Sequence, residues 1–233
     1  QKVNEKNTET LAEYTKYVAS MLQVLGYKNA DAVAKNIVNF EKSIAQTLYT
    51  NEQSRDSNLF YNPKTATELK TLSKNVDLAG YLAKLGVKYD KVIVGEINYY
   101  KNLDKFINQA NLPLIKDYMK FHLLSGSASY LSKDLDAKRF DFYGKFLRGQ
   151  QEQRAQNKRA FELINGSLGE AFGKLYVEKF FPASAKSQMV ELIDYLKKSF
   201  AQHINNLAWM SNKKKKKALN KLNKFTVKVA YPD

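Results

Sequence analysis

The chain of 233 residues contains no cysteine, which excludes disulfide bonds, thiolate metal ligands and thiol nucleophiles. Its two histidines, His122 and His203, leave it almost without the residue that most zinc sites and most acid–base chemistry use near neutral pH. Only four prolines and ten glycines interrupt the chain, which favours long helices over a sandwich of many short strands. An enzyme built from these residues alone would need unusual chemistry.

Basic residues dominate the charge. The chain has 38 Lys+Arg and 23 Asp+Glu, which gives a net charge of +15 and an isoelectric point near 9.6. Such an excess is typical of proteins that bind nucleic acid or anionic membranes. Only five of the basic residues are arginine, the residue that makes bidentate contacts with bases and phosphates. The excess therefore favours a solvated, lysine-rich surface.

No run of about 18 apolar residues is present, so the sequence predicts no membrane-spanning segment. The chain begins at Gln1 rather than at methionine, and its opening stretch to Thr10 lacks the apolar core of a secretory signal. We therefore expect the start of the gene product to lie upstream of this chain.

Apolar residues recur at spacings of three and four through most of the sequence, as in amphipathic helices. Residues 10–48 are predicted as an antiparallel helical hairpin, with Thr8 as the first N-cap, Gly26 as the stop and Asn29 as the second N-cap. Further helices are predicted at 69–72, 78–85, 97–109, 113–131, 140–147, 152–180, 186–207 and after Ser211.

Two β-branched segments, 91–94 and 226–230, are the strand candidates. The sequence thus predicts a mainly α fold, a multi-helical domain of about nine helices with one or two short strands. No linker is long enough to force a split, so residues 1–233 are expected to form a single domain.

Three glycines, Gly166, Gly169 and Gly173, fall on one face of the predicted helix 152–180, with an apolar face opposite. Each glycine costs roughly 0.5–1 kcal/mol relative to alanine in a helix. The pattern therefore predicts either close packing of another backbone or a break in the helix, and the two faces predict burial on both sides.

Other candidate sites have ordinary structural interpretations. Both histidines occupy apolar helix stripes and are expected at the core or its boundary, since no H-E-x-x-H spacing is present to bind a metal. The small residues 125–129 lack the G-x-S-x-G and P-loop patterns, which favours a helix crossing.

Three carboxylates and two further motifs are also expected to be structural. The carboxylates of Asp134, Asp136 and Asp141 lie among basic residues, which favours surface salt bridges. The five lysines 213–217 would point all round a helix rather than to one face. The glycosylation sequon at Asn165 falls in a helix expected to be buried, so we expect it to be accidental.

Several longer motifs are more specific than these. They are Ser-Ala-Ser-Tyr-Leu-Ser at 127–132, Arg-Phe-Asp-Phe-Tyr-Gly at 139–144, Ile-Asn-Gly-Ser-Leu-Gly-Glu at 164–170, Gly-Lys-Leu-Tyr-Val-Glu at 173–178, Asn-Leu-Ala-Trp-Met at 206–210 and the closing Tyr-Pro-Asp at 231–233. Together with Leu-Phe-Tyr-Asn-Pro at 59–63, they resemble the neprilysin and endothelin-converting-enzyme family of zinc metallopeptidases. The resemblance covers nearly the whole chain from about Leu11.

The family's H-E-x-x-H and N-A-x-Y motifs are absent from this sequence, and its one E-x-x-x-D spacing, at 52–56, has no H-E-x-x-H helix before it. The resemblance therefore implies the helical lid domain of a larger enzyme, which restricts entry to the protease cavity, with about 225–233 beginning the connection to the catalytic domain. It implies that this chain has no catalytic, cofactor-binding or metal-binding residue. It also implies that the parent enzyme binds zinc and peptide substrates, and that the partner of this chain is the catalytic domain of the same polypeptide.

In having no cysteine the chain is similar to bacterial members of that family. The location of the protein stays open between the bacterial cytoplasm, export and the cell surface. A second interpretation comes from the charge alone. On it the chain is a free-standing basic helical protein that binds an anionic polymer such as nucleic acid, whereas the lid interpretation expects no specific nucleic acid as a partner.

Overall fold

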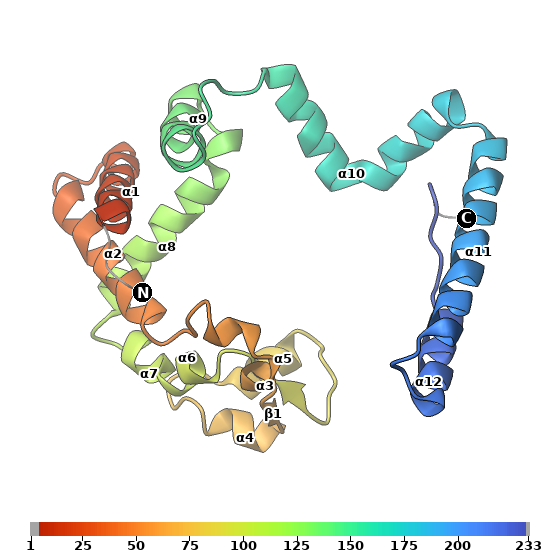
Figure 1. The fold of residues 1–233 in the computed structure, drawn as a ribbon. Coiled ribbons are helices and arrows are strands. Elements are labelled where there is room, and N and C mark those ends of the chain that lie inside the picture. The colour runs from red at the N-terminus through yellow and green to blue at the C-terminus, as the bar shows by residue number, and fades with distance from the viewer. Residues whose placement is uncertain (1–4, 232–233) are drawn as a thin grey trace. The chain divides into compact units, whose positions relative to one another are not determined.

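The computed structural model describes residues 5–231. Contacts divide the chain into two compact units, Gln1–Gln153 and Arg154–Asp233, which we call the first and second units. The described residues form twelve α-helices, several of them short, and one two-stranded sheet, so the mainly α prediction is confirmed (Figure 1). The expectation that 1–233 acts as a single domain of a larger enzyme stays a prediction.

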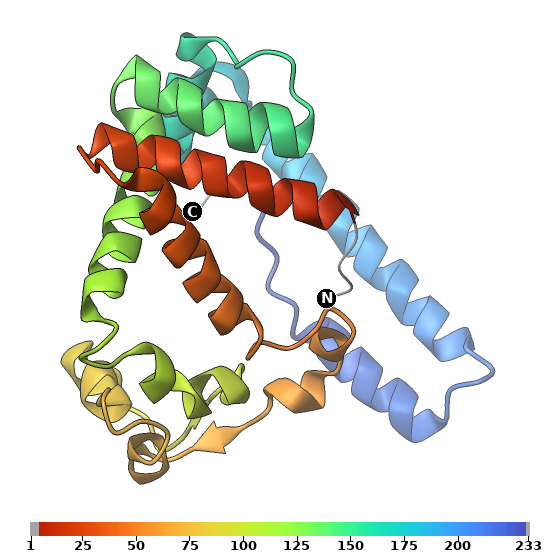
Figure 2. The same ribbon diagram turned by 90° about the vertical axis from the view of Figure 1, so that its left-hand side faces the viewer.

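The first unit is built on the predicted hairpin, whose two helices are α1 (Glu5–Val24) and α2 (Ala30–Ala45). Figure 2 shows α1 in red with α2 beside it. Gly26 ends α1 as predicted: its φ is +84°, and the amide of Tyr27 donates to the carbonyl of Leu22 over 3.2 Å, as in a Schellman motif. Thr8 lies inside α1, so its predicted capping role is wrong.

The hairpin packs against α8 (Leu112–Ser127), which Pro113 opens as predicted. The 3₁₀ turn η2 (Ala128–Tyr130), helix α9 (Lys133–Phe140) and the π-helical η3 (Asp141–Phe146) follow. At the centre of this core the Tyr17 and Phe142 rings stack with centroids 5.2 Å apart, and Phe121 is fully buried. Aromatic side chains thus hold α1 against α8 and η3.

Short elements form a second, smaller core in the first unit, around Leu69 and Ile97. They are η1 (Gln53–Arg55), α3 (Ser57–Phe60), β1 (Pro63–Lys64), α4 (Ala66–Lys70), α5 (Leu78–Lys84), β2 (Val92–Ile93), α6 (Ile97–Lys101) and α7 (Leu103–Phe106). The strand predicted at 91–94 is present as β2, paired antiparallel with β1. The single helix predicted at 97–109 is instead the two helices α6 and α7.

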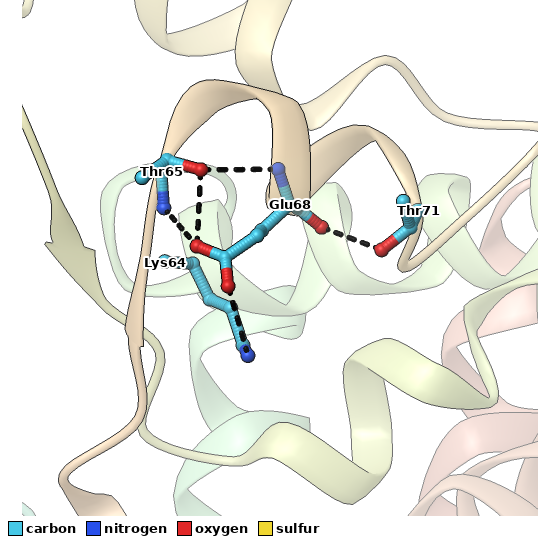
Figure 3. Close-up of polar contacts among 4 residues, drawn as sticks. All are labelled: Lys64, Thr65, Glu68 and Thr71. Carbon is cyan, nitrogen blue, oxygen red and sulfur yellow. Dashed lines mark hydrogen bonds and ion pairs between the residues drawn. The ribbon is translucent and has the colours of Figure 1, made fainter.

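Helix α4 has a capping box, drawn in Figure 3. The backbone amide of Glu68 donates to Thr65 Oγ1 over 3.3 Å, and the amide of Thr65 donates back to Glu68 Oε2 over 2.8 Å. The bond from the Thr65 amide, and then one from the Thr65 hydroxyl to the same carboxylate, lower the pKa of Glu68. They fix the start of a helix only five residues long.

The second unit contains α10 (Gln156–Phe180), α11 (Ala183–Asn206) and α12 (Asn212–Asn223), as the periodicity predicts. Helix α10 breaks at Leu168, whose φ of −129° is not helical. The Phe161 and Phe172 rings lie 5.3 Å apart across this break, whereas eleven residues of straight helix would separate them by about 16 Å. The bend in α10 is visible in Figure 1.

The three glycines of α10 have open space around them. A Cβ added at Gly166 or Gly173 would meet nothing within 4 Å, and one at Gly169 would meet only the Asn165 side chain at 3.7 Å. The predicted close packing of another backbone is therefore wrong for the described residues. The other predicted outcome, a break in the helix, is confirmed at Leu168, between two of the glycines.

The strand predicted at 226–230 is also wrong. This segment is irregular, and Ala230 has a φ of +60°. Tyr231 holds its end against the start of α11, since the Tyr231 ring lies 6.0 Å from that of Phe181 and its carbonyl accepts a 3.2 Å hydrogen bond from Lys186 Nζ. Among residues 5–231 no strand pairs with this segment, and a lone strand has no ladder to stabilise it.

Candidate domain interface

Helices α10 and α11 contain no buried residue. Leu168 is 63% exposed and Phe200 62% exposed, although the sequence pattern predicted both in buried stripes. We call the exposed large apolar side chains of these two helices the α10–α11 apolar surface. Its members are Phe161, Leu163, Ile164, Leu168, Leu175, Tyr176, Phe180, Met189, Val190, Leu192, Tyr195, Leu196 and Phe200.

Exposed large apolar side chains also occur in the first unit, for example Met119 and Leu123, but there they surround a buried core. Among the described residues every buried hydrophobic side chain lies in the first unit except Leu222 of α12. Burying one large apolar side chain stabilises a fold or complex by about 1.5–3 kcal/mol. Monomeric proteins rarely expose apolar patches of more than a few hundred Å², and larger patches mark interaction sites. The α10–α11 apolar surface therefore has the character of an interface.

The C-terminal part of the second unit is strongly basic. Residues 195–231 contain ten lysines and no acidic residue. Four of the five lysines 213–217 are exposed, as expected for a run that points all round α12. Lys215 is half-buried, and its Nζ donates to the carbonyl of Asn205 over 2.7 Å, which ties α12 to the end of α11.

His122 is exposed, but its ring lies 4.9 Å from that of the buried Phe121, which places it at the boundary of the core as the sequence predicts. Its Nε2 is 2.7 Å from Glu41 Oε1, and Tyr14 Oη donates to the same oxygen over 3.0 Å. Burial, followed by the charge of Glu41, raises the pKa of Tyr14 well above its usual range. This cluster joins α1, α2 and α8, and a structural role accounts for all of its contacts.

His203 is exposed on α11, so its predicted place at the core or boundary is wrong. Within residues 5–231 there is no group of three or more His, Asp or Glu side chains positioned to hold a metal ion. The single carboxylate partner of His122, Glu41, is already bonded to Tyr14. The described residues therefore do not fit a zinc site, which needs about three protein ligands.

The remaining sequence candidates are structural. Ser125 is buried where α8 crosses α1, and its Oγ lies 2.7 Å from Tyr17 Oη, which confirms the predicted helix crossing. Asp134 and Asp141 pair with lysines one turn away on the same helix surface, at 3.6 and 2.9 Å. Gln153 Nε2 donates to Asp136 over 2.8 Å. The prediction of surface salt bridges is thus confirmed for two of the three carboxylates.

The sequon at Asn165 is exposed, so the argument that it lies in a buried helix is wrong. No helix in the described part of the chain is both long enough and apolar enough to cross a membrane. The sequence pattern does not reveal the exposure of the α10–α11 apolar surface, because periodicity shows which face of a helix is apolar and not what covers that face. The signal was present in the stripes from Phe161 to Leu175 and from Met189 to Leu207.

Known proteins similar to this chain are peptidases. The family model for the N-terminal part of peptidase family M13 matches residues 1–232. A neutral endopeptidase of Lactobacillus helveticus is 33% identical over 90% of the chain, and human endothelin-converting enzyme 1 is 25% identical over 98%. The chain covers 32% and 31% of these two proteins, so it spans about a third of the length of the curated relatives it matches.

Solved structures agree with this assignment. Zinc metalloprotease ZMP1 of Mycobacterium tuberculosis, in complex with an inhibitor, is 30% identical and matches with a TM-score of 0.83 over 96% of this chain and 34% of that one. PepO of Lactobacillus rhamnosis matches with a TM-score of 0.88 over 99% of this chain and 37% of its own, at 24% identity. The resemblance to neprilysin and endothelin-converting enzymes is thus confirmed, and the chain belongs to peptidase family M13.

Proposed function

We propose that this chain is the helical, non-catalytic domain of a zinc metalloendopeptidase, and that it restricts the entry of substrates to the protease cavity. The observation that carries the proposal is the α10–α11 apolar surface, which nothing among the described residues of the second unit covers. The matched relatives are about three times as long as this chain, and their additional length is the natural source of a covering surface. We assign that cover to the catalytic domain of the same polypeptide.

Such a domain acts by steric exclusion. A closed cavity admits flexible peptides, excludes folded proteins and controls the water around the bound peptide. In the parent enzyme zinc would supply an activated water and polarise the scissile carbonyl. The residues described here do not fit that metal. The role of this chain is therefore to shape the cavity, and it contributes no catalytic residue.

The test compares the 233-residue chain with the full-length parent enzyme. We expect the chain alone to hold no stoichiometric zinc by metal analysis and to leave a quenched fluorescent peptide intact. The parent should cleave that peptide and lose the activity to a chelator. One tightly bound zinc in the chain, or peptide cleavage by it, would contradict the non-catalytic assignment.

The access role has its own measurement. The parent should cleave the fluorescent peptide when it is free, and should cleave it many times more slowly when both of its ends are joined to folded domains too large for the cavity. A denatured form of the same fusion serves as the control, because its cleavage should recover. Equal cleavage of the free peptide and the folded fusion would contradict steric exclusion.

A second candidate function rests on the lysine-rich C-terminal part. Ten lysines without an acidic residue in 195–231 would attract an anionic polymer. Binding of this kind appears at low salt, and the logarithm of its association constant falls linearly with the logarithm of the salt concentration. Tight binding to duplex DNA that survives physiological salt would favour this candidate. Loss of DNA binding at physiological salt would favour the proposed role in substrate access.

A further inference from the structure

A cleft of about 620 Å³ lies in the first unit, between α2 and the segment that contains α7 and the start of α8. Its volume falls within the range of sites that hold small ligands or short peptide segments. Seven of its eleven lining residues carry an amide or a hydroxyl, and Lys105 is the only charged side chain among them. No contact described above uses this cleft.

Three exposed amides line the α2 wall of the cleft, where the hydroxyls of Ser43 and Thr47 donate to backbone carbonyls. The side-chain amides of Asn36, Asn39 and Gln46 make no hydrogen bond to any of residues 5–231, although each amide can donate two and accept two. On the opposite wall Asn102 Nδ2 is already bonded to the Asn98 carbonyl over 2.8 Å, as in an ordinary helix cap. The side-chain amides that can exchange water for a ligand's polar groups therefore lie along α2.

The spacing of these amides fits an extended chain. Asn36, Asn39 and Gln46 lie along one side of α2, and at 1.5 Å per residue the first and last are about 15 Å apart. An extended peptide rises about 3.3 Å per residue, so the row matches four to five residues of a ligand. Side-chain amides present donor and acceptor together, which is what a peptide group requires.

The floor of the cleft is apolar. Phe40 and Phe106 meet edge to face with ring centroids 6.1 Å apart, and Leu114 lies beside them. Phe40 and Leu114 are half-buried, so they are the part of this floor that an apolar side chain of a ligand can contact. The floor does not suit a sugar ring stacked on an aromatic face, because Phe106 is only 6% exposed and its ring meets the neighbouring ring at 85°. Lys105 adds one positive charge at the opposite wall, suited to one carboxylate.

We propose that this cleft binds an extended peptide segment, with its main chain on the α2 amides, an apolar side chain on the Phe40–Phe106 floor and a carboxylate near Lys105. The inference rests on the proposed function, since a domain that controls peptide access meets peptides as its substrates. It goes beyond that function by giving the domain a peptide-binding site of its own. The site performs no chemistry and acts by holding a peptide on the domain.

The test is fluorescence anisotropy on the 233-residue chain. The probe is an octapeptide of alanine and serine with one central phenylalanine, a fluorophore at its amino end and a free carboxyl end. We expect saturable binding that weakens about tenfold or more in the double variant Asn36→Ala/Asn39→Ala, which loses two hydrogen-bonding side chains. The matched control Gln23→Ala/Gln188→Ala removes two exposed helical amides outside the cleft and should change the affinity less than twofold.

A further variant tests the charge. Lys105→Gln should weaken binding of the free-carboxyl peptide severalfold and leave binding of its carboxyl-terminal amide unchanged. Circular dichroism melting curves should match for all of these variants, because none of the replaced side chains pairs within residues 5–231.

No saturable binding by the wild-type chain would overturn the inference, and so would equal affinity in the Asn36→Ala/Asn39→Ala variant. Competition by a maltooligosaccharide in place of a peptide would overturn it as well. None of these results depends on zinc or on hydrolysis. Failure of the cleft is therefore distinct from failure of the lid proposal, which the metal and cleavage assays of the parent enzyme decide.

Discussion

Gly144, in the π-helical η3, is buried with no room for a side chain. A Cβ at this position would collide with the Phe140 ring, which packs beside it. We therefore expect Gly144→Ala to lower the free energy of unfolding by about 1–3 kcal/mol, the usual cost of overpacking. Chemical denaturation of the 233-residue chain measures this.

Gly126 is the matched control for that substitution. It lies in α8, and an added Cβ would meet nothing within 4 Å. Gly126→Ala should leave the free energy of unfolding unchanged or raise it by about 0.5–1 kcal/mol, because alanine has the higher helix propensity. A Gly144→Ala variant as stable as Gly126→Ala would show that η3 is not packed as described.

The carboxylate of Asp104 ties α7 to the segment that follows α4. It accepts hydrogen bonds from the Ser73 hydroxyl and from the backbone amides of Lys74, at 2.9 Å, and Asn75, at 3.1 Å. The Ser73 bond, and then the two amide bonds, lower the pKa of Asp104 below its usual value. The folded state therefore binds the Asp104 proton less readily than the unfolded state does.

The sign of the resulting pH dependence follows from that lowered pKa. The stability contributed by Asp104 is fully present above its unfolded pKa, near 3.9, and is lost as the pH falls through the folded value. Asp104→Asn should therefore be less stable than wild type at pH 6, and the difference should shrink as the pH falls below about 4. Urea denaturation at several pH values measures it, and a constant difference would contradict the account.

At the scale of elements, local signals predicted most of the first unit. The hairpin, the stop at Gly26 and the opening of α8 at Pro113 each depend on a few adjacent residues, and all three are confirmed. Strand β2 was also predicted, whereas its partner β1 was not, because Pro63 and Lys64 become a strand only by pairing with β2. The strand predicted at 226–230 does not form, because no strand among residues 5–231 pairs with this segment.

The glycines of α10 lead to an element-scale prediction. Because a Cβ at Gly173 would lie in open space, Gly173→Ala should raise the helical signal in circular dichroism and leave the melting temperature equal or higher. Gly169→Leu should likewise cause no loss of stability, since only the Asn165 side chain is near. A fall of several degrees in either variant would mean that another backbone does pass this face.

At the scale of the whole molecule, the two units differ in both charge and packing. The second unit has 16 Lys+Arg and 6 Asp+Glu, a net of +10, which is two thirds of the charge of the chain. It also has the exposed apolar surface, while the first unit holds nearly all of the buried core. The candidate interface could not be predicted from the sequence, since the same stripes would describe a helix buried within its own domain.

The central claim is that the parent enzyme covers the α10–α11 apolar surface. Hydroxyl-radical footprinting with mass spectrometry tests it directly, because the oxidation of a side chain follows its exposure. Met189 and Phe200 are 43% and 62% exposed in this chain. The account predicts that both oxidise readily in the 233-residue chain and are strongly protected in the full-length parent, while the buried Met21 and Phe121 stay protected in both. Equal oxidation of Met189 and Phe200 in the two proteins would contradict the account.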